Sequence, residues 1–218
     1  LEVVEQNVQG SYSPAGNADS MYDRAGSFGD HMRLVAQMVR EPDLGLRTAT
    51  VDLGGWDTHT NQGGATGGHG NNLNNFSDAF AALKDDLGAE PSGNGGSLWD
   101  DTIVVSMTEF GRTSKQNGSN GTDHAEASVM FVGGGAVNGG VYNCDSTNWE
   151  TGATEDDSAM FEVNSRYLSH RTDFRAVFGE IFERHFGVAP ALLDTILPGY
   201  TFVKSDYPEV FNYLNFLT

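Results

Sequence analysis

The chain has 218 residues, of which 38% are hydrophobic and 11% aromatic, so it is long enough for one domain with a sizeable core. Its 30 acidic and 12 basic residues give a formal net charge of −18, which repels phosphate backbones and argues against nucleic-acid and membrane-surface binding. No segment approaches the roughly 20 apolar residues of a membrane span, and a single cysteine, Cys144, allows no internal disulfide.

The chain begins with a polar stretch and then a helical pattern. Residues 1–24 show no apolar period, so we interpret them as an irregular lead-in. From Phe28 onward, apolar residues recur at helical spacing. Ser27 is the predicted N-cap of this helix, and Pro42 marks its end.

A strand and a second helix are predicted next. Residues 48–53 have strand composition, and two glycines directly after them would end the strand. The glycine- and asparagine-rich residues 60–72 predict a mobile loop that carries His69. Residues 73–87 repeat apolar side chains at the spacing of an amphipathic helix.

The second half predicts two further strands and one helix. Apolar residues at 102–107 and 128–132 are typical of buried strands, and the glycine run 133–140 is typical of a tight turn. Residues 145–160 are acidic and aperiodic, which indicates a surface excursion, and a helix starts at 172. This order of elements predicts an α/β fold with a mostly parallel central sheet flanked by helices, formed as a single domain over residues 1–218.

Metal-ligand side chains follow the predicted strands at three places. Asp57 and His59 come after the first strand, Glu109 after the second, and Asp123 with His124 after the next loop. Because ligands bind at the carboxyl ends of strands in open α/β sheets, we expect these residues to converge. Carboxylate and imidazole together suit Zn²⁺, Mn²⁺ or Fe. Each pair alone is also consistent with a turn or a helix cap.

Two further residues have open roles. Arg112 has a planar fork that could bind a substrate oxyanion, and it could equally pair with one of the many acids. His170 lies close to Asp173 near a predicted helix start, where it could be a further metal ligand or a local cap.

Four stretches together resemble a known family. They are GGWDTHTNQ, DDTIVVSMTEFGRTSKQNG, GTDHAEASVMFVGGG with GGVY, and TDFRAVFGEIFERHFG. Their order and spacing, from about Phe28 to Gly199, resemble the bacterial family labelled as domain of unknown function 1501, which is placed in the alkaline phosphatase and sulfatase superfamily.

That resemblance implies an alkaline phosphatase-like sandwich and a metal-dependent hydrolase-like protein that acts on phosphate or sulfate esters. It implies that Asp57, His59, Glu109, Asp123 and His124 hold a divalent metal such as Zn, Mn, Ca or Mg, with Arg112 gripping a small anionic ester. It also implies export through a twin-arginine signal, hence a periplasmic or exported bacterial protein. The nucleophile would lie upstream, in a longer domain of which this chain is the C-terminal part.

A rival reading of the same residues is a non-catalytic exported binding or scaffold protein, in which the Asp/His cluster is structural or vestigial. If strands of the sheet belong to a missing N-terminal segment, an exposed sheet edge would favour association with that segment or a homo-oligomer.

Overall fold

The computed structural model describes residues 12–143, 166–211 and 213–218. They fall into two compact units. The first unit consists of Leu1–Thr102 with the short segment Gly118–Gly121, and the second of Ile103–Asn117 with Thr122–Thr218. Within the described residues, none of the helices combines the length and the apolar composition of a membrane span. The single domain over residues 1–218 and its acidic excursion at 145–160 stay predictions, the latter lying outside the described residues.

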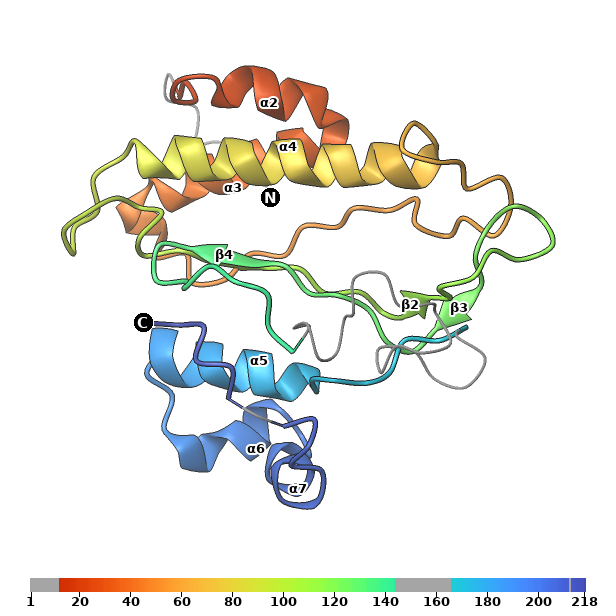
Figure 1. The fold of residues 1–218 in the computed structure, drawn as a ribbon. Coiled ribbons are helices and arrows are strands. Elements are labelled where there is room, and N and C mark those ends of the chain that lie inside the picture. Colours follow the sequence, from red (N-terminus) through yellow and green to blue (C-terminus); the bar gives the residue numbers. More distant parts are fainter. Residues whose placement is uncertain (1–11, 144–165, 212) are drawn as a thin grey trace. The chain divides into compact units, whose positions relative to one another are not determined.

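The first unit is a layer of three helices, α2 (Ala18–Arg24), α3 (Gly26–Val39) and α4 (Gly68–Gly88), which pack side by side (Figure 1). A 3-10 turn, η1 (Pro42–Leu44), follows α3. Their shared core consists mostly of small and aromatic side chains: Ala18, Tyr22, Phe28, Met32, Ala36, Ala79, Ala82, Leu83 and Leu87. The close approach of α2 and α3 requires glycine at position 29, where a Cβ atom would lie 1.9 Å from the Tyr22 carbonyl oxygen.

A buried carboxylate lies inside this helical layer. Asp86 of α4 is fully buried. It accepts hydrogen bonds from the Ala15 amide at 2.9 Å, Arg40 at 2.7 Å, the Tyr22 hydroxyl at 3.2 Å and the Tyr12 hydroxyl. Burial first, and then the neighbouring Asp86 charge, raise the pKa of both tyrosines above their usual range. The residues before α2 are therefore fastened to α4.

Several expectations for the first half need correction. Residues 18–24 form α2, so the irregular lead-in does not extend to residue 24. The N-cap of α3 is Ala25, and Ser27 lies in its first turn. Residues 48–53 are not a strand, because they have no ladder partner within the described part of the chain. The helix predicted at 73–87 is confirmed, but it starts earlier, at Gly68.

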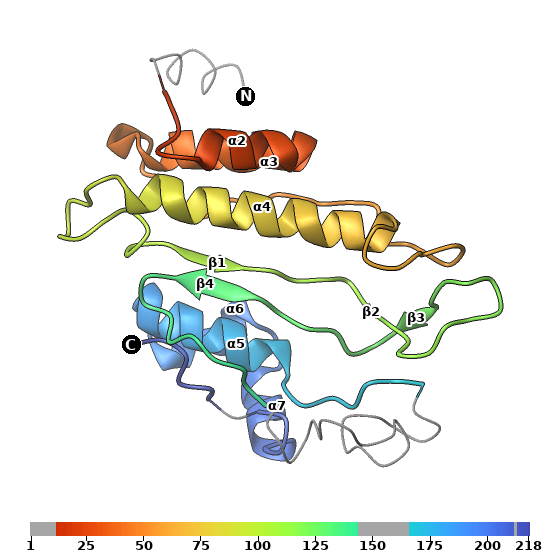
Figure 2. The same ribbon diagram turned by 45° about the horizontal axis from the view of Figure 1, so that its top comes forward.

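The second unit contains two short antiparallel ladders nested in one long hairpin (Figure 2). In the first, β1 (Ile103–Val105) pairs with β4 (Val132–Gly134), with Val104 opposite Gly133. In the second, β2 (Gly111–Arg112) pairs with β3 (His124–Ala125). The described strand pairs are thus antiparallel, and the mostly parallel sandwich stays a prediction.

The strand predicted at 128–132 begins only at Val132. Just before it, the Phe131 amide donates to the Ser106 side-chain oxygen at 2.8 Å, and the Ser106 amide donates to the Phe131 carbonyl at 2.9 Å. The strand predicted at 102–107 is confirmed in its central part, Ile103–Val105. The turn predicted over 133–140 is confirmed only in part, because Gly133 and Gly134 belong to β4. The turn follows them, with the Val137 amide donating to the Gly134 carbonyl at 3.1 Å.

Helices cover the β1–β4 ladder and complete the second unit. The helix predicted from 172 is confirmed as α5 (Phe174–Glu180), and Asp173 caps it by accepting from the Arg175 amide. A π-helical turn η3 (Ile181–His185), a 3-10 turn η4 (Pro190–Leu192) and helices α6 (Leu193–Ile196) and α7 (Tyr200–Asp206) follow. Their apolar faces form two clusters, centred on Val177, Ile181, Phe216 and Leu217 and on Ala176, Leu193, Tyr200 and Phe211.

Candidate metal centre

A turn held by α4 presents the first Asp–His pair. Gly55 has a φ of +86°, a conformation that favours glycine. A Cβ atom there would lie 3.0 Å from the side-chain nitrogen of Asn72 on α4, which also donates to the Gly54 carbonyl at 3.1 Å. The indole of Trp56 donates to the Leu53 carbonyl at 2.7 Å. These bonds fix the backbone directly before the pair.

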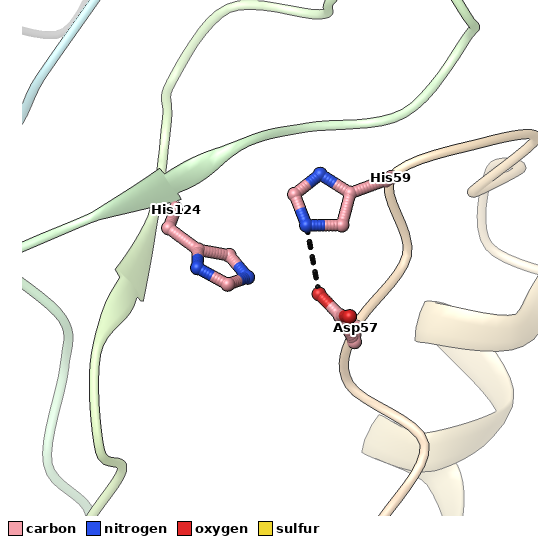
Figure 3. Close-up of side chains that lie close together, drawn as sticks. All are labelled: Asp57, His59 and His124. Atoms are coloured by element: carbon pink, nitrogen blue, oxygen red, sulfur yellow. Dashed lines mark ion pairs between the residues drawn. The ribbon is translucent and has the colours of Figure 1, made fainter.

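Asp57 and His59 contact each other directly. The Nε2 atom of His59 lies 2.9 Å from Oδ1 of Asp57 (Figure 3). The Asp57 side chain is 67% exposed and the His59 side chain 41% exposed. An ion pair this exposed contributes little to stability. Its carboxylate and imidazole are nevertheless the ligand types that a borderline divalent metal prefers.

A distant segment of the chain bonds to the loop that follows this pair. The Asn61 amide donates to the Ser119 carbonyl at 3.0 Å, and the Gln62 amide donates to the Asn120 carbonyl at 2.9 Å. Gly121 then lies against the backbone of Thr58 and His59. Residues 118–121 therefore belong to the first unit, although their chain neighbours on both sides belong to the second.

The second Asp–His pair lies on the β2–β3 ladder. His124 is opposite Arg112 in the register. Next to it, the Thr113 amide donates to the Asp123 carbonyl at 2.9 Å, and the Asp123 amide donates to the Thr113 hydroxyl at 3.1 Å. Gly111 must be glycine here, because a Cβ atom would lie 1.7 Å from a backbone oxygen of Ala127. The backbone of the pair is thus fixed by its neighbour strand.

The side chains of this second pair have separate partners. Asp123 accepts from Arg166 at 2.7 Å and from the Asn117 amide group at 2.9 Å, so each carboxylate oxygen has a partner within the second unit. The ring of His124 stacks on Phe110, with 3.9 Å between the ring centroids. In the first pair the carboxylate contacts its own histidine, whereas here it contacts an arginine and an asparagine.

Other residues predicted from the sequence take varied positions. Glu109 is exposed in the turn between β1 and β2. Arg112 donates through Nε to the Thr122 hydroxyl at 3.1 Å and through Nη2 to the Thr122 carbonyl. His170 lies 3.3 Å from the Glu126 carboxylate and does not cap α5, since Asp173 does so.

His69 lies in the first turn of α4, which corrects the prediction that it belongs to a mobile loop. Its ring meets Trp56 edge-on, with 5.2 Å between centroids. The sequence reasoning missed this contact and two others, Arg166 with Asp123 and Phe110 with His124. The first two partnerships join residues 13 and 43 positions apart, and no spacing signal connects them.

Comparisons with known proteins identify a family but no function. No curated protein matches the chain, and no solved structure matches it either. One family model matches residues 5–197, and it is described as "Protein of unknown function (DUF1501)". Since this match covers most of the 218 residues, the chain belongs to that family of proteins of unknown function.

Proposed function

We propose that this protein is a metal-dependent hydrolase-like protein that acts on phosphate or sulfate esters. The observation that carries the proposal is the Asp57–His59 pair, in which Oδ1 of the carboxylate lies 2.9 Å from Nε2 of the imidazole. Both atoms belong to one turn of the first unit. Carboxylate and imidazole are ligand types that a borderline divalent metal binds.

The proposed ligands are Asp57, His59 and His124, each of which offers one ligand atom. One carboxylate and two imidazoles form a donor set that fits Zn²⁺ or Mn²⁺ better than Ca²⁺ or Mg²⁺, which prefer oxygen ligands. Glu109 and Asp123 stay predicted ligands of the wider set. Asp123 is the weaker of the two, because its oxygens already accept from Arg166 and Asn117.

The chemistry of the proposed site is ester hydrolysis. A divalent metal bound there would lower the pKa of a water or hydroxyl nucleophile and stabilise charge on the leaving oxygen. Oδ1 of Asp57 and Nε2 of His59, which lie 2.9 Å apart, are close enough to bind the same ion. Arg112 would hold a small anionic ester, in a position set by its bonds to Thr122. We further propose that the protein is exported to the bacterial periplasm or beyond.

Elemental analysis tests the metal site first. Purified protein freed of chelator is analysed beside the His59→Ala, His124→Ala double variant. We expect a stoichiometric divalent metal in the parent and none in the variant. A parent that holds no metal, even after Zn²⁺ and Mn²⁺ are added back, would refute the proposed site.

An activity screen tests the hydrolase half separately. The longest natural form of the protein, loaded with each metal in turn, is assayed on chromogenic phosphate and sulfate esters. We expect turnover that disappears in the double variant. Inactivity on every ester under every metal would refute ester hydrolysis while leaving the metal site standing.

One observation favours a second candidate, a non-catalytic exported binding or scaffold protein with a structural or vestigial site. The carboxylate of Asp123 accepts from Arg166 and Asn117, so in the second Asp–His pair the aspartate stabilises the fold. This candidate predicts that Asp57→Ala also lowers thermal stability. An Asp57→Ala variant as stable as the parent would contradict it.

A further inference from the structure

His69, in the first turn of α4, contacts the turn that presents the first Asp–His pair, and both belong to the first unit. Its ring meets the Trp56 ring edge-on, with 77° between the ring planes and 5.2 Å between the centroids. Trp56 directly precedes Asp57 in the chain. Three residues after His69, a spacing that places side chains on one face of a helix, Asn72 donates to the Gly54 carbonyl at 3.1 Å. Two side chains of α4 therefore hold this turn.

The backbone around His69 is fixed by the loop that leads into α4. A Cβ atom at Gly67 would lie 2.4 Å from the Gln62 carbonyl oxygen, and one at Gly70 would lie 2.3 Å from the Ala65 carbonyl oxygen. The two glycines flank His69 in the chain. Because loop backbone lies against both of them, a shift of His69 away from the Trp56 contact would displace the loop as well.

The His69 ring contributes its shape to this contact rather than a hydrogen bond of its buried nitrogen. Its Nδ1 atom is buried and has no hydrogen-bond partner in the part of the chain that the structure describes. Aromatic rings attract each other edge-on without any hydrogen bond. A phenylalanine ring at position 69 can therefore make the same contact with Trp56, whereas alanine cannot.

Trp56 connects this contact to the backbone of the pair. Its indole donates to the Leu53 carbonyl at 2.7 Å, and its own carbonyl accepts from the Thr58 amide at 2.9 Å. Thr58 stands between Asp57 and His59. A displacement of Trp56 would thus strain bonds on both sides of Asp57, so the position of the indole affects the positions of both ligand side chains.

We propose that His69 is a positioning residue of the metal site, which acts through Trp56 to hold the Asp57–His59 turn against α4. The proposal rests on the proposed function, because it assumes that this pair binds a metal. It goes further by giving a role to a histidine outside the cluster of candidate ligands.

The test compares His69→Ala and His69→Phe with the parent in the full chain. Zn²⁺ affinity is measured by titration, and the visible absorption of the Co²⁺-loaded protein reports the geometry around the metal. We expect His69→Ala to raise the dissociation constant for Zn²⁺ by roughly 10- to 100-fold, the range found when residues that orient ligands are lost. Its Co²⁺ spectrum should also change. His69→Phe should restore both properties to those of the parent.

A matched control removes another histidine from the same unit. His31 is exposed on α3, and His31→Ala should match the parent in Zn²⁺ affinity and in the Co²⁺ spectrum. Loss of an imidazole as such is thereby separated from loss of the contact with Trp56.

Different outcomes identify different failures. A parent that binds neither Zn²⁺ nor Co²⁺ would refute the proposed metal site. A parent that binds metal, with a His69→Ala variant of the same affinity and spectrum, would refute the positioning role alone. A His69→Phe variant as weak as His69→Ala would also overturn that role, because the imidazole nitrogens rather than the ring shape would then matter.

A second measurement needs no variant and covers the case in which His69→Ala fails to fold. Coupling between two sites is reciprocal, so a contact that favours metal binding must itself be stabilised by metal. Hydrogen exchange of the Trp56 indole N–H, which donates to Leu53, should slow when Zn²⁺ is added to the parent. An indole exchange rate that saturating Zn²⁺ leaves unaffected would overturn the proposal.

Discussion

The two Asp–His pairs look alike in the sequence but are constructed differently. In the first, Asp57 contacts its own histidine, and the side chains are 67% and 41% exposed. In the second, Asp123 is 39% exposed and bound to Arg166, while His124 stacks on Phe110. The Asp–His motif alone therefore does not determine whether its carboxylate is available to bind a ligand or is bonded to other residues of the protein.

A third carboxylate extends the comparison to the buried extreme. Asp86 is fully enclosed and accepts from one arginine, two tyrosines and a backbone amide. Removing one partner of a buried charge costs far more than removing one partner of an exposed pair. Asp86 should thus contribute most to stability, Asp123 less and Asp57 least. Their availability to a metal should follow the opposite order.

The largest effect should follow Asp86→Ala. The substitution leaves Arg40 and the tyrosines Tyr12 and Tyr22 without their shared acceptor in a buried site, so we expect a loss of about 3–5 kcal/mol in the free energy of unfolding. Urea unfolding of the full chain measures it. Asp85→Ala, the exposed neighbour on the same helix, is the control and should change stability by less than about 0.5 kcal/mol. Equal stability of the two variants would contradict the burial argument.

A pH dependence should follow from the same buried cluster. Burial and Asp86 raise the pKa of Tyr12 and Tyr22, so the folded state keeps these protons to higher pH than the unfolded state, whose tyrosines titrate near about 10. Their contribution is complete below about pH 10 and decreases as the pH rises further. Unfolding measured between about pH 8 and 11 should show this decline.

A double variant isolates the two tyrosines in that experiment. The pKa of Tyr213 in the second unit is also raised, by burial and by its bond to Glu183, so it contributes to the decline in the parent. Tyr12→Phe, Tyr22→Phe protein should be less stable at pH 8 and should lose less stability at alkaline pH. A decline equally steep in parent and variant would assign the effect to other groups.

A smaller effect should follow Asp123→Ala. Its bonds to Arg166 and Asn117 are charge-assisted but partly exposed, so we expect a loss of about 1 kcal/mol. A double-mutant cycle with Arg166→Ala measures their coupling directly. Coupling near zero, together with a loss of metal affinity as large as that of Asp57→Ala, would make Asp123 a ligand rather than a structural residue.

The smallest change in stability should follow Asp57→Ala. Since the pair is exposed, unfolding should change by less than about 0.5 kcal/mol. Metal affinity should fall at least about 100-fold, because a ligand is removed rather than an outer partner. Asp52→Ala, an exposed aspartate in the same extended segment, should leave both quantities unchanged. Unchanged stability together with lost metal affinity in Asp57→Ala would support the metal site, because the scaffold candidate predicts lower stability for this variant.

Sequence patterns predicted three of the helices well and the strands poorly. Helices α3, α4 and α5 could be predicted because their apolar residues recur at helical spacing, and this spacing is a local property of the sequence. A strand exists only if another segment pairs with it, which explains why residues 48–53 were predicted wrongly. The short helix α2 was missed because its seven residues bury only Ala18 and Tyr22, too few to show a period.

The sequence by itself determined which chemistry is present: an acidic chain, the amphipathic helices, and two Asp–His pairs, one after an apolar segment and one after a polar loop. Only the tertiary structure decided how each pair is used. Arg166 is 43 residues from Asp123, and residues 118–121 meet the loop after His59 from almost 60 residues away. Contacts over such separations depend on the path of the folded backbone, and a glycine such as Gly121 shows its importance only when the atoms around its missing Cβ are known.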